Sequence, residues 1–209
     1  IYLKNNPQME ICLETLIFFY DLMPIAMRTD KQSQLLARFD GIFAQLAQLK
    51  SFSLETVSNV TPKDLAETLT NILDKTVKEK TNVQQMNHFA RACVFLTNCS
   101  QILLKLMPGE DEVLRIMLER LREFFTTRNP TLQITTFNRI LATQWNGNFK
   151  MAKFVAEEGL KGTVRSLRRT QSLQMLKTFF KNHHLMAQNE KQAVKYSEKI
   201  SECFKGGLR

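Results

Sequence analysis

The chain shows helical periodicity from one end to the other, and this pattern constrains its fold more than any other feature. Apolar residues recur at intervals of three and four positions in one segment after another, as they do along the packed face of an α-helix. The strict alternation of apolar and polar residues that a half-buried strand requires does not compete with this pattern in any segment. The sequence therefore predicts an all-α chain.

Prolines and capping residues indicate where the helices begin and end. The clearest start is at Thr61, a capping residue that is followed by Pro62 at the first helical position and by Asp64 in the first turn. Asp30 is a suitable N-cap for the preceding helix, and Pro24 should bend or end the helix before that. The nine expected helices cover about 7–28, 31–50, 62–73, 83–106, 110–127, 132–143, 149–160, 163–182 and 189–204, with a linker at 51–60 and a turn at 145–148.

The expected helices have similar lengths and are joined by short loops, an arrangement typical of antiparallel helical pairs stacked in a row. No strict internal repeat is present, so a regular named repeat is not supported. We expect residues 1–209 to be a single helical-repeat segment of a longer chain, folded as an irregular α-solenoid of HEAT- or armadillo-like helical pairs. A compact all-α domain is the alternative.

The formal charge of +9 is concentrated near one end of the chain. Residues 1–106 are nearly neutral, with 11 basic and 10 acidic side chains, whereas residues 150–209 carry 13 basic and 5 acidic side chains. Residues 107–149 carry 5 of each. This asymmetry predicts that the C-terminal part presents a surface to a polyanion such as RNA or an acidic protein segment.

Three arginines stand at the beginning of the helix expected at 163–182, in the stretch "TVRSLRRTQSLQML". Helical spacing places Arg165, Arg168 and Arg169 on the apolar half of that helix, although the helix dipole disfavours cations at this end. Internal ion pairs with Glu157, Glu158 or an acid on a neighbouring helix are one interpretation. Direct phosphate contact, which suits the planar guanidinium group, and docking to an acidic protein are the other two.

We expect these arginines to share two roles. Arg165 or Arg169 would anchor the junction between the helices, and Arg168 would be freer to meet a ligand. Lysines further along the chain are candidates for diffuse attraction of the same partner. The predicted RNA- or partner-binding residues are therefore Lys161, Arg165, Arg168, Arg169, Lys177 and Lys181, with Lys191, Lys195 and Lys199 as further contributors to the charge.

Sequence motifs of catalysis are missing: we find no glycine-rich phosphate loop, nucleophile elbow or HExxH-type metal motif. The cysteines at 12, 93, 99 and 203 and the histidines at 88, 183 and 184 lack the spacing of a zinc site. The pair Glu157-Glu158 has no second acidic cluster with which to hold two metal ions. We therefore expect no metal, no cofactor and no enzymatic activity.

The aromatic residues are spaced like core residues. Trp145 and the fifteen phenylalanines follow the helical apolar pattern, and only Phe149 and Phe154 are plausible for stacking on bases beside the basic groups. No apolar run approaches the roughly 20 residues of a membrane-spanning helix.

Four stretches resemble, in the same order, segments of the DNA polymerase phi family, which comprises the fungal DNA polymerase V and the animal nucleolar Myb-binding protein. They are "NNPQMEICLETLIFFYDLMPIAMRTDKQSQLLARF", "HFARACVFLTNCSQILLKL", "LREFFTTRNPTLQITTFNRIL" and "LRRTQSLQMLKTFFKN". The last resembles a segment near the C-terminal end of the family. The resemblance implies a nuclear and nucleolar α-solenoid scaffold acting in ribosome biogenesis and ribosomal RNA production.

We therefore expect a binding scaffold that contacts pre-ribosomal RNA or ribosome-assembly factors through its basic C-terminal surface. One alternative is a regulator that binds transcription factors in an apolar groove between helices. Another is a transport adaptor of the importin-like kind, which would share only the solenoid architecture. None of these functions involves a small-molecule substrate or a membrane.

Overall fold

Thr61 and Asp64 illustrate how the sequence sets the helix boundaries. In the computed structural model, a carboxylate oxygen of Asp64 accepts hydrogen bonds from the backbone N–H and the hydroxyl of Thr61, at 2.6 and 2.8 Å. The hydroxyl oxygen of Thr61 in turn accepts a bond from the backbone N–H of Asp64, at 3.4 Å. This reciprocal pair is a capping box, so the predicted start of helix α5 (Pro62–Lys78) is confirmed.

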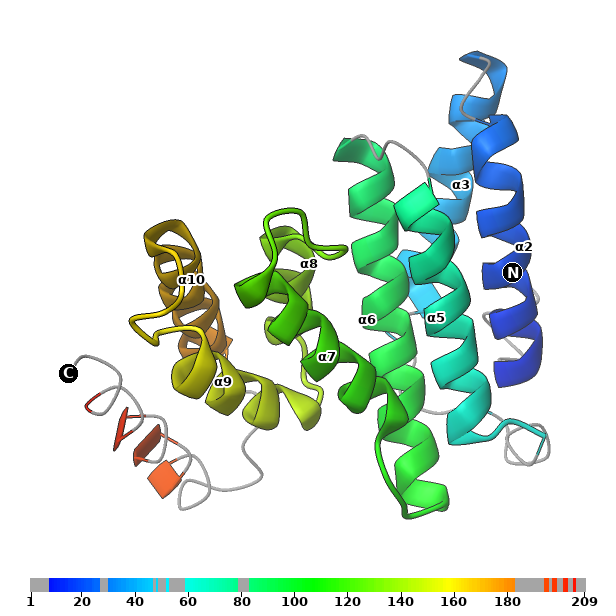
Figure 1. Cartoon of the computed structure of the whole chain (residues 1–209). Helices are drawn as coiled ribbons and strands as arrows, with labels where there is room; N and C mark the ends of the chain where they lie inside the picture. The colour runs from blue at the N-terminus through cyan, green and yellow to red at the C-terminus, as the bar shows by residue number, and fades with distance from the viewer. Residues whose placement is uncertain are drawn as a thin grey trace. The chain divides into compact units, whose positions relative to one another are not determined.

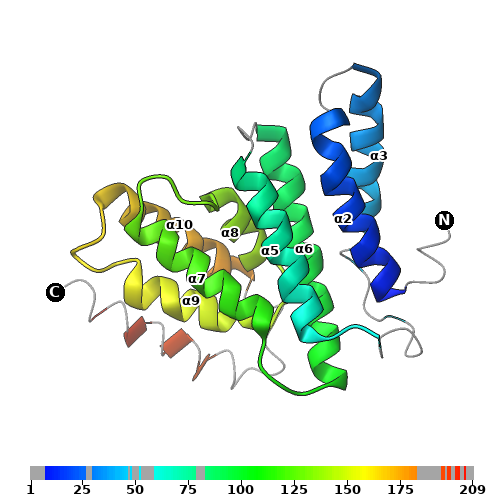
Figure 2. The ribbon, with the colours of Figure 1, turned by 45° about the vertical axis from the view of Figure 1, so that its right-hand side comes forward.

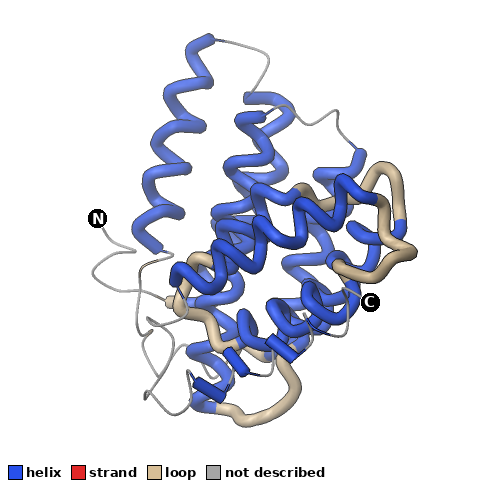
Figure 3. Tube along the Cα trace, turned by 90° about the vertical axis from the view of Figure 1, so that its left-hand side faces the viewer, coloured by secondary structure: helices blue, strands red, loops and turns tan. Residues whose placement is uncertain are grey.

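The structure describes residues 8–26, 30–46, 59–78 and 83–182, together with a few positions among 48–52 and 194–205. All regular structure over these residues is helical, and Figure 3 accordingly shows helices and loops without a strand. The helices in Figure 1, in chain order, are α2 (Met9–Ala26), α3 (Asp30–Leu46), α5 (Pro62–Lys78), α6 (Val83–Leu106), α7 (Glu112–Thr126), α8 (Ile134–Leu141), α9 (Gly147–Glu158) and α10 (Ser166–Asn182).

Most predicted helices agree with the observed ones to within a few residues. Helix α2 ends at Ala26, two residues after Pro24, as expected for a proline that cannot support a continuing helix. Asp30 is the first helical residue of α3 and not the residue before it. Helix α5 extends to Lys78, five residues beyond its predicted end. The expected linker and the ninth helix, 189–204, lie largely outside the described residues.

Two predicted helix starts in the second half of the chain differ from the observed ones by two and three residues. Helix α9 begins at Gly147, so the expected turn at 145–148 is two residues shorter than predicted. Helix α10 begins at Ser166, three residues later than predicted. Its first helical hydrogen bond runs from the backbone N–H of Arg169 to the carbonyl of Arg165, at 3.0 Å, which places Arg165 immediately before the helix.

The chain divides into two compact units, Ile1–Val113 and Leu114–Arg209. In the first unit, α2 packs against α3 and α5, and α6 packs against the same two helices (Figure 2). An aromatic series lies in its core: the ring centroids of Phe19 and Phe43 are 5.7 Å apart, and those of Phe43 and Phe95 are 6.1 Å apart. Burial of these rings accounts for the close packing of α2, α3 and α6.

In the second unit, α10 packs against both α8 and α9 (Figure 1). Edge-to-face aromatic pairs connect its helices: Phe124 of α7 with Phe137 of α8, and Phe149 of α9 with Phe179 of α10, each with ring centroids 5.5 Å apart. The predicted role of the aromatic residues as core is confirmed for these four rings, which are all buried.

The junction between α8 and α9 is fixed by a buried amide. Asn148 is fully buried, and its Nδ2 donates hydrogen bonds to the carbonyl oxygens of Ile140, at 2.8 Å, and Thr143, at 3.0 Å. Ile140 lies in the last turn of α8 and Thr143 follows the helix by two residues, so a side chain of α9 caps the end of α8. Gly147 lies directly against the ring of Trp145, which leaves no room there for a Cβ atom.

Candidate functional site

The first turn of α10 is the point in the second unit where the predicted arginines meet a distant segment of the chain. The guanidinium of Arg168 lies over the ring of Phe124 of α7, with Cζ 4.1 Å from the ring centroid. Its Nη1 donates to Oε1 of Gln171 at 2.9 Å, and its Nη2 donates to the carbonyl oxygen of Arg128 at 3.3 Å. Arg168 therefore joins α10 to α7 and to the loop that follows α7.

The environment of Arg168 is unfavourable for its charge. Partial burial, together with the nearby positive charge of Arg165, lowers the pKa of the Arg168 guanidinium below its ordinary value. The group remains protonated at neutral pH, since an arginine pKa starts above 12. The aromatic face of Phe124 compensates for part of the lost hydration through a cation–π interaction.

Arg165 and Arg169, by contrast, are exposed. The expectation that one of them anchors the helix junction while Arg168 stays free is therefore wrong, and the structure reverses the roles. Arg165 precedes the helix, so its side chain does not follow the helical face on which the sequence pattern placed it. Arg169 lies about 100° around the helix from Arg168, beyond the edge of the packed stripe.

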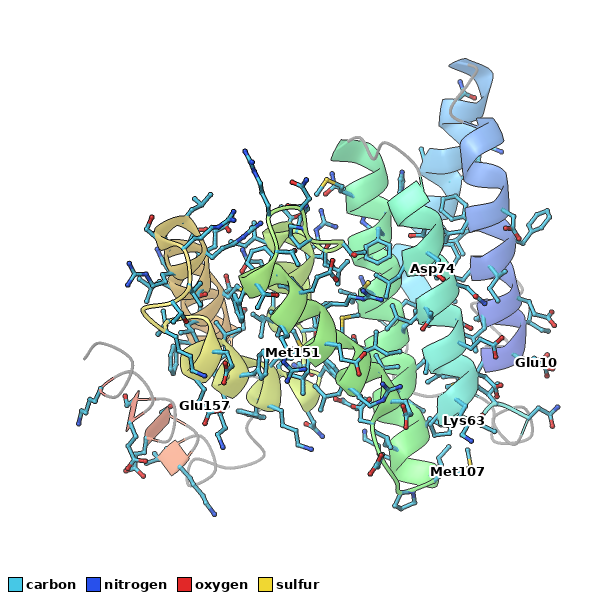
Figure 4. The ribbon with its side chains drawn as sticks, viewed as in Figure 1. Glu10, Lys63, Asp74, Met107, Met151 and Glu157 are labelled. Carbon is cyan, nitrogen blue, oxygen red and sulfur yellow. The ribbon has the colours of Figure 1, made fainter. Side chains whose placement is uncertain are left out.

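The predicted ion pairs between these arginines and the acids of α9 are not formed among the described residues. Glu158 instead accepts a bond from Nζ of Lys161 at 2.7 Å, and Glu157, labelled in Figure 4, pairs with Lys153 at 3.5 Å. Lysines three and four positions away on the same segment reach these carboxylates more easily than the arginines of the next helix do. Lys161 is exposed, and its charge is partly offset by Glu158.

The packed side of α10 also differs from the apolar half predicted from the sequence. The buried stripe consists of Ser172, Met175, Leu176 and Phe179, and Arg168 continues this stripe towards the start of the helix. Helical spacing places Leu173 on the apolar half, yet its exposed fraction is 48%, and that of Leu167 is 65%. The neighbours α8 and α9 decide which side is buried, and the small Ser172 allows α10 to approach the end of α9 closely.

That approach involves Gly159, the residue after α9. The hydroxyl of Ser172 lies within hydrogen-bond distance of the carbonyl oxygens of Gly159, at 3.1 Å, and Arg168, at 2.8 Å. A Cβ atom on Gly159 would clash with this hydroxyl and would come within 2.7 Å of Phe125 Cζ. A glycine after α9 and a serine within α10 therefore set the position of the arginine-bearing turn.

The loop between α7 and α8, which contains Arg128, is held against α7 by Glu123. Glu123 accepts hydrogen bonds from the backbone N–H and the hydroxyl of Thr131, both at 2.8 Å, and pairs with Arg120 at 3.0 Å. Burial alone raises the pKa of Glu123, but the bonds from Thr131 and Arg120 outweigh it and hold that pKa below its ordinary value. The ionised carboxylate thus ties the loop back onto α7.

Sequence reasoning missed Arg128 as a site residue. Arg128 is exposed in this loop, and its carbonyl is the acceptor for Arg168, although 40 residues separate the two. No local pattern relates such distant positions, so the sequence held no signal for this neighbour. We define the arginine surface as Arg128, Arg165, Arg168 and Arg169. Lys161 is not included in this set, although it belongs to the same loop as Arg165.

Lys177 and Lys181 do not belong to this surface. Both are exposed on α10, and they lie nine and thirteen residues beyond Arg168, which corresponds to about 13 and 20 Å along the helix axis. Nine residues are also about two and a half turns, so Lys177 projects from the side of α10 opposite Arg168. Lys195 is exposed, and Lys191 and Lys199 lie outside the described residues.

Neither aromatic candidate for base stacking is available. Phe149 is buried against Phe179. Phe154 is half-buried, stacks on Phe125 with ring centroids 6.3 Å apart, and carries the guanidinium of Arg122 at 5.4 Å from its centroid. The arginine surface therefore offers charge and guanidinium planes without an exposed aromatic ring.

The described residues contain no group of three histidine, cysteine or acidic side chains that could hold a metal ion. Cys12, Cys93 and Cys99 are buried, and burial raises the pKa of the Cys12 thiol to about 11 and also raises the pKa values of the other two thiols. These thiols are protonated at neutral pH and do not act as thiolate nucleophiles. Cys203 lies outside the described residues. Within the described ranges, every helix is too short or too polar to span a lipid bilayer.

Comparison with protein families gives a match over residues 6–207 to the family described as Myb-binding protein 1A-like, TPR repeats. The chain belongs to the Myb-binding protein 1A-like family. The resemblance predicted from the four sequence stretches is thus confirmed at the level of the Myb-binding protein, and proteins of this family are in general nuclear or nucleolar. Comparisons with curated proteins and with solved structures gave no significant match.

Membership of the Myb-binding protein 1A-like family also decides the fold class. TPR repeats are pairs of antiparallel helices, and the eight described helices occur without a strand. The prediction of an all-α, irregular α-solenoid is therefore confirmed. The named repeat is of the TPR kind, whereas the sequence suggested HEAT- or armadillo-like pairs; both kinds stack helical hairpins.

Proposed function

We propose that this Myb-binding protein 1A-like chain is a non-enzymatic nucleolar scaffold that contacts pre-ribosomal RNA during ribosome biogenesis and ribosomal RNA production. The arginine surface of the second unit carries the proposal. Its exposed guanidinium groups, on Arg165 and Arg169, have no carboxylate partner among the described residues. Within the family, the order of the four matching stretches favours the C-terminal part of the DNA polymerase phi proteins.

Phosphate is the ligand chemistry that suits these groups best. A guanidinium presents a planar fork of donors that matches two phosphate oxygens. Arg168 supports the first turn of α10 through its contacts with Phe124, Gln171 and the Arg128 carbonyl. Arg165 and Arg169 flank Arg168 in the sequence, and both are exposed. Without an exposed aromatic ring, recognition would depend on the RNA backbone more than on the bases.

A ribosome-assembly factor with an acidic segment is the second candidate partner. Leu167, with an exposed fraction of 65%, lies in the first turn of α10, between Arg165 and Arg168 in the sequence. An exposed leucine adds nothing to phosphate binding, whereas it would contact apolar residues of a protein partner. The same arginines would then pair with aspartate and glutamate side chains of that partner.

We also propose that the chain does not catalyse nucleotidyl transfer. Nucleotidyl transfer requires carboxylates that hold two metal ions about 4 Å apart. Glu157 and Glu158, the adjacent acids near the arginine surface, are instead paired with Lys153 and Lys161. Template-dependent nucleotide incorporation by the purified chain, abolished by Glu157→Gln and Glu158→Gln together, would overturn this part of the proposal.

Charge reversal at the arginine surface tests the main proposal. We expect Arg165→Glu with Arg169→Glu to weaken binding of a fluorescent single-stranded RNA about tenfold or more, and to flatten its salt dependence. The log–log slope should fall by roughly 0.7 for each phosphate of a single strand that the variant no longer neutralises. Arg168 is left unchanged in this variant because its replacement would also disturb packing.

The matched control is Lys177→Glu with Lys181→Glu, which reverses two charges on the same helix about 13–20 Å away. We expect this control to reduce RNA affinity less than the arginine variant, since these lysines supply only diffuse attraction. An arginine variant that loses binding to an acidic, leucine-containing peptide but keeps its RNA affinity would favour the assembly factor. Unchanged affinity for both ligands would refute the role of the surface.

A further inference from the structure

Helices α2 and α10 have opposite charge compositions. Helix α2, "MEICLETLIFFYDLMPIA", contains three acidic residues and no lysine or arginine. Helix α10, "SLRRTQSLQMLKTFFKN", contains four basic residues and no acidic residue. Most solvent-exposed helices carry both signs because neighbouring opposite charges stabilise them. The acidic α2 and the basic α10, one in each unit, are therefore suited to a partner of the opposite sign.

The exposed side of α2 has a regular pattern. Glu10, Glu14, Phe18 and Asp21 are all exposed, at intervals of four, four and three residues, so they form one ridge along the helix. Phe18 has an exposed fraction of 57%, so it departs from the core role predicted for the aromatic residues. Glu10, labelled in Figure 4 near the start of α2, accepts a 3.4 Å hydrogen bond from Asn59 and stays exposed.

The exposed side of α10 has the same pattern with the opposite charge. Arg169, Leu173, Lys177 and Lys181 are exposed and follow one another at intervals of four residues. Leu173, with an exposed fraction of 48%, stands between Arg169 and Lys177, as Phe18 stands between Glu14 and Asp21. Each ridge thus places one apolar side chain between charges of one sign, with successive residues spaced about 4.5–6 Å apart along the helix.

We propose that the α2 ridge of one copy of this chain docks on the α10 ridge of a second copy. Phe18 and Leu173 would form the dehydrated centre of the contact, and the carboxylates and cations would pair around them. Contacts of α2 with α2, or of α10 with α10, would bring like charges together, so the association is head to tail. Such a heterologous contact can extend beyond two copies.

The complementary charges of the two ridges, at similar spacing along their helices, identify the partner as a second copy of this chain. An apolar-centred acidic ridge and an apolar-centred basic ridge occur on the same chain, so each copy supplies the surface that the other requires. This association goes beyond the proposed function, because it uses the outer ridge of α10 and the arginine surface shares only Arg169 with it. RNA binding and self-association can therefore fail separately.

Two charge-reversed variants provide the test. The acidic-ridge variant carries Glu10→Lys with Glu14→Lys, and the basic-ridge variant carries Lys177→Glu with Lys181→Glu. We expect the wild-type chain to associate in sedimentation velocity in a way that depends on concentration and weakens with salt. Each variant alone should bind itself about tenfold or more weakly, because its two ridges then carry charges of the same sign.

Mixing the two variants in equal amounts is the decisive measurement. In the mixture, the unchanged α10 ridge of one variant meets the unchanged α2 ridge of the other, and the two altered ridges are also complementary. Association should return towards the wild-type level. A contact between α2 and α10 within one chain would not be restored by mixing. Circular dichroism and melting temperature, measured for each variant, establish that both remain folded.

A third variant addresses the apolar centre without changing any charge. Phe18→Ser should weaken self-association and leave RNA affinity unchanged, since Phe18 is exposed in the first unit. The proposal is overturned by a wild-type chain that stays monomeric at low salt and high concentration. It is also overturned by variants that associate as the wild type does, or by folded variants whose mixture does not associate.

Discussion

The guanidinium carbon of Arg168 lies 4.1 Å from the centroid of the Phe124 ring, and this contact joins the arginine-bearing turn of α10 to α7. We expect Arg168→Ala to lower the free energy of unfolding by about 1–2 kcal/mol, because it removes the cation–π interaction and the bonds to Gln171 and the Arg128 carbonyl. Denaturation in urea, with circular dichroism as the signal, measures the change.

Arg169→Ala is the matched control for this prediction. Arg169 is exposed and makes no side-chain bond among the described residues, so its removal should change stability by less than about 0.5 kcal/mol. Equal effects of the two substitutions would show that Arg168 contributes no more to the free energy of unfolding than Arg169 does.

Gly159 is predicted to resist replacement by alanine. A methyl group at this position would clash with the hydroxyl of Ser172 and come within 2.7 Å of both Phe125 Cζ and the Val155 carbonyl oxygen. We expect Gly159→Ala to destabilise the chain by about 1–3 kcal/mol, because α10 would be pushed away from the end of α9. In Gly162→Ala the added methyl meets no atom within 4 Å, so a loss of similar size there would contradict the steric explanation.

The buried amide of Asn148 gives a third prediction. Asn148→Ala removes the donor to the carbonyls of Ile140 and Thr143 and leaves both acceptors without that bond inside the protein. We expect a loss of about 1–3 kcal/mol in the free energy of unfolding. Asn129→Ala, at an exposed asparagine of the neighbouring loop, should change stability by less than about 0.5 kcal/mol.

The helices were predictable because their signals are local. Thr61 caps α5 as expected and forms a capping box with Asp64, and Pro24 lies in the last turn of α2, as expected for a helix that it terminates. Backbone donors at a helix start must find a partner within a few residues, and a nearby side chain can supply it whatever the rest of the chain does. The all-α fold class follows from such signals added along the chain.

The side on which α10 packs was less predictable, because it depends on neighbours. Leu167 and Leu173 have the chemistry of core residues, yet they are exposed, while Ser172 is fully buried at the contact with Gly159. A close approach between helices favours a small side chain over a large one. The periodicity of the sequence does not show which neighbouring helix makes this approach. The same ambiguity led Arg165 and Arg169 to be placed on the packed half.

The sequence indicated which types of residue form the candidate site, but not how these residues are arranged in space. The concentration of positive charge near α10 was visible in the sequence, but the partners of Arg168 were not. Its contacts with Phe124 and the Arg128 carbonyl cross 44 and 40 residues of chain. The bonds between Glu123 and Thr131 close the α7–α8 loop, which carries the Arg128 carbonyl, whereas Phe124 belongs to α7 itself.

His88 gives the last prediction, a dependence of stability on pH in the first unit. The ring of His88 is buried with its centroid 6.0 Å from that of Phe19, and burial lowers the pKa of His88 below its ordinary value of about 6.5. The folded chain therefore keeps this side chain neutral at a pH where the unfolded chain already binds a proton. Stability must fall as the pH decreases below about 6.5, because the unfolded state then binds more protons.

We expect the free energy of unfolding to decrease between pH 7 and pH 5, with a contribution from His88 of at most about 1.4 kcal/mol per pH unit. Other groups also titrate in this range, so the informative quantity is the difference between the wild type and His88→Gln. Glutamine is polar but does not titrate, and the variant should be less stable at pH 7 and lose less stability on acidification. Parallel pH profiles for the two proteins, measured by urea denaturation at each pH, would mean that His88 is protonated equally in the folded and unfolded states.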